Sequence, residues 1–104
     1  MSTMAIAWVR LGDGVRNSLA TPEEFIRTVV EREAITTSGT SAPSTVCPAG
    51  ANAAIVTAVD VALIIASGPA TPVASPTNGV DCAVGEKAYL YAEPGVTMIA
   101  GIER

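Results

Sequence analysis

The feature that most constrains this chain is an apolar run over residues 53–67 (AAIVTAVDVALIIAS), in which Asp60 is the only charged residue. The run is longer than a typical β-strand. It is rich in Val, Ile and Thr, whose branched side chains favour strands. Asp60 stands where a hairpin turn or a bulge would divide the run. We therefore predict two strands, over residues 53–59 and 61–67.

The second of these predicted strands is apolar at every position from residue 61 to residue 66. A strand with one face in water alternates apolar and polar residues. Continuous apolar character instead indicates that both faces are buried. In a thin sandwich, the second face is most simply covered by another subunit, and this is what we expect here.

Short predicted strands fill most of the remaining chain, and turn residues separate them. Pro94-Gly95 has the composition of a type II turn. The loop over residues 68–79 is predicted to be long and exposed, and long ordered loops often have a function. Evenly spaced short strands predict an all-β fold, a small antiparallel β-sandwich or a jelly-roll-like barrel. The further predicted strands cover residues 4–10, 27–37, 80–84, 88–93 and 96–102.

The stretch around residues 22–33 carries two conflicting signals. Thr21, Pro22 and Glu24 have the pattern that begins a helix. The β-branched residues that follow favour a strand. We predict an optional turn at residues 22–25 and then a strand, with one short helix near residues 22–33 as the alternative.

The length of 104 residues predicts one domain. We expect it to consist of an N-terminal strand and arm over residues 1–35 and a β core over residues 36–104.

The composition predicts that this domain meets other proteins. Hydrophobic residues make up 49% of the chain and charged residues 15%, against roughly 25% charged in typical soluble domains. A chain this short cannot bury so much apolar surface alone, and exposed apolar patches usually meet a partner. We therefore expect a homo-oligomer, a dimer or trimer, or a lattice component.

The charges argue against nucleic acid and membrane partners. The net charge is −4, and the six basic residues are scattered, whereas binding to phosphates requires clustered cations. No apolar run is long enough to span a bilayer, and no secretory signal is recognisable. We expect a protein that is made in the cytosol and binds neither nucleic acid nor membrane.

The sequence offers little for catalysis or for metal binding. Histidine is absent, which excludes histidine-based acid–base pairs and triads. The carboxylates have the pattern of a solvated surface. Cys47 and Cys82 are not spaced for zinc; we predict buried thiols, with a disulfide between them as the alternative. We predict no catalytic residue, no cofactor and no metal, and therefore no enzyme.

Aromatic residues and loop prolines are the candidate contacts to a partner. Two strand residues spaced as Tyr89 and Tyr91 share one face, and aromatic residues are enriched at interface hot spots. Trp8 qualifies for the same reason, and a core position is the alternative for all three. The candidate partner contacts are Trp8, Tyr89, Tyr91, Pro69, Pro72 and Pro76.

Alternating charges mark the stretch Glu31-Arg32-Glu33 within a predicted strand. Charges on a strand edge discourage uncontrolled pairing with other chains, and we favour this interpretation. A salt-bridging contact to a neighbouring subunit is the alternative.

The second half of the chain carries a set of loop and strand motifs. These are Thr37-Ser38-Gly39-Thr40-Ser41-Ala42, Pro48-Ala49-Gly50-Ala51, Asp60-Val61-Ala62-Leu63, Ser67-Gly68-Pro69-Ala70-Thr71-Pro72, Val84-Gly85-Glu86, Tyr89, Pro94-Gly95-Val96 and Ile99-Ala100-Gly101-Ile102. The set resembles a group of small virion proteins of tailed bacteriophages. The resemblance covers residues 36–102 and implies a structural β-domain without catalytic residues, commonly a capsid cement or decoration protein.

The resemblance implies a protein on the capsid exterior, assembled in the host cytoplasm, that stabilises the head by binding major capsid subunits. The acidic net charge suits a position outside the shell, away from the packaged DNA. The alternatives are a minor head–tail connector, tail or fibre protein, or a non-viral β-sandwich binding module such as an adhesin or a carbohydrate-binding domain.

Overall fold

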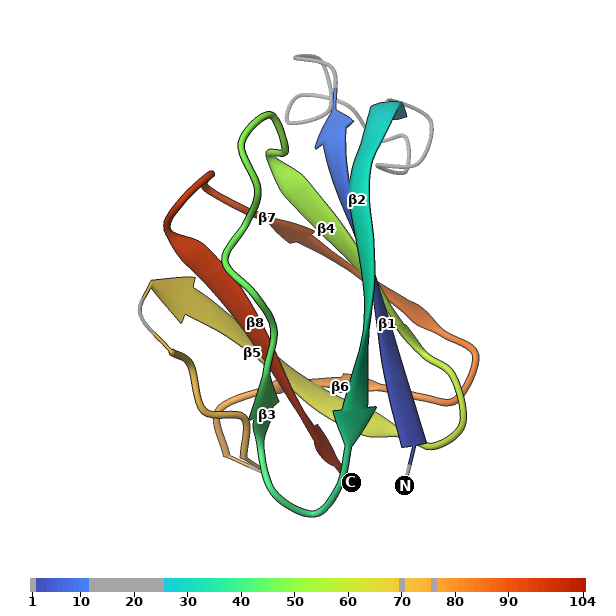
Figure 1. Cartoon of the computed structure of the whole chain (residues 1–104). Helices are drawn as coiled ribbons and strands as arrows, with labels where there is room; N and C mark the ends of the chain where they lie inside the picture. The colour runs from blue at the N-terminus through green and yellow to red at the C-terminus, as the bar shows by residue number, and fades with distance from the viewer. Residues whose placement is uncertain (1, 12–25, 70, 76) are drawn as a thin grey trace.

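The computed structural model describes residues 2–11, 26–69, 71–75 and 77–104, and none of these is helical. Their strands form two antiparallel four-stranded sheets that face each other as a β-sandwich, which confirms the predicted fold class (Figure 1). Sheet A contains, in spatial order, β2 (Ile26–Thr37), β1 (Ser2–Leu11), β4 (Ala53–Ala58) and β7 (Lys87–Tyr91). Sheet B contains β3 (Ala42–Pro43), β8 (Thr97–Glu103), β5 (Leu63–Pro69) and β6 (Val80–Cys82).

The first strand lies in the middle of sheet A. β1 pairs with β2 on one side and with β4 on the other. β2 is extended from Ile26 onward, so the alternative of a helix is wrong for residues 26–33, while residues 22–25 lie outside the described residues. Pairing with β1 fixes the β-branched stretch of β2 as a strand, because such residues suit a paired and half-buried surface.

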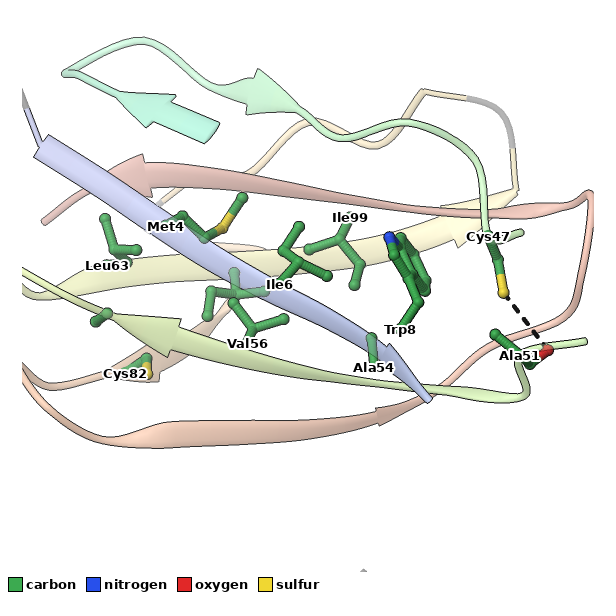
Figure 2. Close-up of a cluster of buried hydrophobic side chains, with 12 residues drawn as sticks. Met4, Ile6, Trp8, Cys47, Ala51, Ala54, Val56, Leu63, Cys82 and Ile99 are labelled. Atoms are coloured by element: carbon green, nitrogen blue, oxygen red, sulfur yellow. Dashed lines mark hydrogen bonds between the residues drawn. The ribbon is translucent and has the colours of Figure 1, made fainter. Parts of the chain in front are cut away.

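Large side chains of β1 meet small residues in the core between the sheets (Figure 2). Trp8 is fully buried and stands opposite Ala54 of β4 in the strand register. Met4 occupies the space above Gly101 of β8, where an added Cβ would lie 2.6 Å from the Met4 Sδ. The core is therefore filled by a few long side chains placed against alanine and glycine.

The apolar run divides into two strands at Asp60, as predicted, but β4 and β5 belong to different sheets, so the expected hairpin turn or bulge is wrong. Asp60 is exposed in a bend that carries the chain from sheet A to sheet B. Val56 of β4 and Leu63 of β5 are both fully buried in the shared core. The two apolar strands thus bury their side chains against each other across the sandwich instead of pairing edge to edge.

The first part of β5 is buried on both faces, at Leu63, Ile64 and Ile65, whereas Ser67 and Pro69 are exposed. Leu63 and Ile65 belong to the core, whereas Ile64 points to the outer side of sheet B and is nevertheless buried. Gly79 lies directly against Ile64, and an added Cβ there would collide with the Ile64 side chain. Ala74 is also buried, and its amide donates a 2.9 Å hydrogen bond to the Ser41 hydroxyl. At Ile64 the outer side of β5 is therefore covered by the chain itself, where we expected another subunit.

Side chains of β2 form hydrogen bonds with Thr45, after β3, and with Glu103 of β8, at one side of the sandwich. β2 is an edge strand of sheet A, as its charged stretch predicts. The Glu33 carboxylate accepts hydrogen bonds from the Thr45 amide, at 3.1 Å, and from the Thr45 hydroxyl. At the last residue of β2, the Thr37 hydroxyl donates a 3.3 Å hydrogen bond to the Glu103 carboxylate. Glu33 therefore has a partner within the chain.

The two cysteines are free and buried, and they lie at opposite ends of the core (Figure 2). The alternative of a Cys47–Cys82 disulfide is wrong. Burial raises the pKa of the Cys47 thiol. Burial, together with the nearby Glu86 carboxylate, raises the pKa of the Cys82 thiol despite an opposing backbone hydrogen bond at Ala58. Both thiols therefore stay protonated at neutral pH.

We expect neither thiol to react readily in the folded protein, because each is buried and protonated and the thiolate is the reactive form. Reaction with Ellman's reagent at neutral pH should be at least about 100-fold slower than in denaturant. The denatured protein serves as the control, and both thiols should react there. Rapid labelling of the folded protein would contradict the described burial.

Gly79→Ala should destabilise the protein by about 1–3 kcal/mol, because the added methyl group must displace Ile64 or the backbone of β5. Gly39→Ala is the matched control, since an added Cβ there has nothing within 4 Å. Urea unfolding of the three proteins measures the difference. Equal stability of the Gly79 variant and the wild type would show that residues 77–79 do not pack on sheet B as described.

Candidate functional site

The outer face of sheet A, which points away from the core, is the most distinctive surface of the described structure. Strand pairing arranges its residues in rows that cross all four strands. Because side chains alternate along a strand, residues paired in one row share a face. The three rows, from β2 to β7, are Val29–Val9–Ala53–Tyr91, Arg32–Ala7–Ile55–Tyr89 and Ala34–Ala5–Thr57–Lys87.

This face is hollowed along its centre. The two central strands contribute mainly small residues, while the edge strands contribute long ones such as Arg32, Lys87 and Tyr89. A groove of about 410 Å³ results, and its lining spans all four strands. We call it the sheet A groove. Its lining side chains include Ala5, Ala7, Val9, Val29, Arg32, Ile55, Thr57 and Lys87.

The floor of the groove continues into a second hydrophobic cluster. Val9, Leu11 and Ala53 are buried there, and Ala7 and Ile55 pack against them half-buried. A smaller hollow of about 20 Å³, next to Tyr89 and Tyr91, shares Val9 and Ile55 with the groove. The outer face of sheet A therefore carries a continuous apolar strip.

Two cations line opposite sides of the groove. Arg32 belongs to edge strand β2 and Lys87 to edge strand β7. They are two of the six basic residues in a chain of net charge −4. Glu33 also lines the groove, but its carboxylate is engaged by Thr45. The groove thus combines an apolar floor with one cation at each margin, and the Glu33 carboxylate lies next to Arg32 on the β2 side.

The two candidate tyrosines lie on this face, as their spacing predicts. Tyr89 is 38% exposed and Tyr91 is 52% exposed. Both tyrosines, like Lys87, also take part in interactions within the chain. Their placement beside the groove is the one part of the predicted contact set that coincides with a concave apolar surface.

The structure separates the other candidate contacts from the tyrosines. Trp8 is fully buried, which corrects the prediction of a partner contact: its indole fills the core beside Ala54 and does not reach the surface. Pro69 ends β5 in sheet B, and Pro72 follows in the segment packed on that sheet. Pro76 lies outside the described residues.

Sequence reasoning missed the small residues on the groove floor and the role of Arg32. A signal for the floor is present, because β1 is apolar at every position from Met4 to Val9. Like β5, it can bury one face in the core and present a second apolar face. The position of Arg32 at the groove margin follows from the pairing of β2 with β1, which the sequence does not reveal.

Within the described part of the chain, no three His, Cys, Asp or Glu side chains gather into a group that could hold a metal ion. The same residues include no helix long and apolar enough to cross a membrane. The chemistry that the groove lining offers is apolar contact together with hydrogen bonding and ion pairing from Arg32, Thr57 and Lys87.

Comparison with known proteins gives no match for this chain, whether with family models, with curated proteins or with solved structures.

Proposed function

We propose that this protein is a structural component of a tailed-bacteriophage virion, most specifically a capsid decoration protein, that binds other virion subunits through the outer face of sheet A. The observation that carries the proposal is the apolar sheet A groove, flanked by partly exposed tyrosines. Contiguous apolar surface on a small domain marks an interaction site.

The two outer faces of the sandwich differ in a way that supports this assignment. On sheet B, the chain buries Ile64 and Ala74 with its own residues. On sheet A, a hollow of about 410 Å³ crosses the strands between Arg32 and Lys87. A partner that fills this hollow removes apolar surface from water, which contributes roughly 25 cal/mol per Å² before the costs of association.

The net charge and the sequence resemblance both support a position on the outside of the particle. A net charge of −4 suits the outside of a shell that encloses DNA. The loop motifs between residues 37 and 102 resemble those of small virion proteins. A major capsid subunit is therefore the proposed partner, with self-association into a dimer or trimer as part of the same assembly.

A sugar-binding sandwich is the second candidate function. Tyr89 and Tyr91 stand two residues apart on one face and are both partly exposed. Aromatic rings in such an arrangement can stack on a sugar ring. Binding of a glycan array that is lost in Tyr91→Ala, together with absence of the protein from particles, would favour this function over the virion proposal.

We expect the protein to be present in roughly hundreds of copies per purified particle, because a decoration protein repeats with the symmetry of the capsid lattice. Quantitative mass spectrometry of purified particles, with the major capsid protein as the internal standard, measures the ratio. A count of about a dozen or fewer would instead indicate a ring at the connector or tail.

Thr57→Arg should weaken binding to particles that lack the protein by at least about tenfold, since it places a long cation on the apolar groove floor. Val73→Arg is the matched control, because Val73 is 62% exposed in the segment that packs on sheet B. Co-sedimentation with particles measures binding, and thermal unfolding verifies that both variants are folded. Wild-type binding by Thr57→Arg would place the interface elsewhere.

A further inference from the structure

We propose that the sheet A groove receives an amphipathic α-helix of the partner subunit, with carboxylates on both flanks of its apolar stripe. The inference rests on the proposed function and names the chemistry of the occupant. Helix-in-groove docking places an apolar helix face into a hydrophobic channel. Three properties of the groove favour this occupant: its width, its floor and its charged margins.

The width of the groove matches a helix. Its margins lie on β2 and β7, which are separated by two central strands. Three strand spacings give about 14 Å between the margins. A helix with its side chains is about 10–12 Å across, so one helix fills this width, whereas a single extended strand would leave much of it empty.

The floor lets a helix approach closely. Ala5 and Ala7 of β1 stand beside Thr57 and Ile55 of β4, and all four are half-buried. Short side chains here leave the hollow of about 410 Å³. This space accommodates several aliphatic side chains from successive turns of one helix face, which recur every three or four residues.

The cations at the groove margins favour a helix that carries negative charge. Arg32 lies at one side of the groove and Lys87 at the other, displaced from each other by one row. A helix with carboxylates on both flanks places an acidic group near each cation, and such complementarity favours the correct partner and speeds association. A second copy of the chain offers no helix among its described residues and would bring the same two cations to the contact.

The test uses the full chain, labelled with ¹⁵N, and three synthetic peptides. The first peptide is helical, with Leu and Ala on one face and Glu on both flanks. The second carries Lys in place of each Glu, and the third carries a central Pro that breaks the helix. At low ionic strength, the Glu peptide should bind at least about tenfold more tightly than the Lys peptide. It should shift the amide signals of β1 and β4, and the Pro peptide should not bind measurably.

Two charge-reversal variants of the protein, one inside the groove and one outside it, test whether the groove cation sets the preference for the Glu peptide. Arg32→Glu should reverse the preference in favour of the Lys peptide. Arg10→Glu makes the same charge change in sheet A at an exposed residue that does not line the groove, and it should keep the preference for Glu. Thermal unfolding verifies that both variants are folded.

Three results would overturn the inference. Equal binding of the Glu and Lys peptides would remove the charge argument, and equal binding of the Pro peptide would indicate an extended occupant. Concentration-dependent shifts of β1 and β4 signals without peptide would identify a second copy as the occupant. None of these peptide assays involves particles. If the peptides gave one of these results while Thr57→Arg still lost binding to particles, the helix inference would be wrong and the proposed function would stand.

Discussion

The structure depends on β1, which is apolar on both faces and lies in the middle of sheet A. Its inward side chains, Met4, Ile6 and Trp8, fill the space between the sheets. They fit because small residues lie next to them: Ala54 pairs with Trp8 within sheet A, and Gly101 of sheet B lies against Met4. The outward side chains of the same strand form the floor of the groove. One strand thus links the packing of the core to the surface that we propose as the interface.

The two outer faces of the sandwich differ in how their apolar residues are covered. On sheet B, residues 71–75 and 77–79 return over the surface, and contacts such as Gly79 against Ile64 bury the apolar residues of β5. On sheet A, the central strands carry small side chains between the longer ones of β2 and β7. The groove on sheet A is therefore the surface that we propose for binding the capsid subunit.

Local sequence patterns predicted the elements well, and non-local packing accounts for what they missed. β-branched residues and turn dipeptides located the strands, and Gly95 has the positive φ of 75° that the Pro94-Gly95 turn requires. Local patterns do not, however, predict which strands pair with one another. Asp60 predicts a turn, but whether the next strand pairs with β4 or crosses to the other sheet depends on how the whole core packs, in which Val56 and Leu63 are both buried. Cover for Ile64 comes from Gly79, fifteen residues away in sequence, and no local pattern reveals that contact.

Hydroxyl-radical footprinting of the protein, free in solution and bound to particles, shows which face of the sandwich the partner covers. We expect binding to protect the outer face of sheet A, with lower oxidation of Tyr89, Tyr91 and Ile55, while Val73 on the sheet B side stays as reactive as in the free protein. Protection of Val73 and Val80 with unchanged tyrosine oxidation would show that the partner binds sheet B instead, and the proposed interface on sheet A would be wrong.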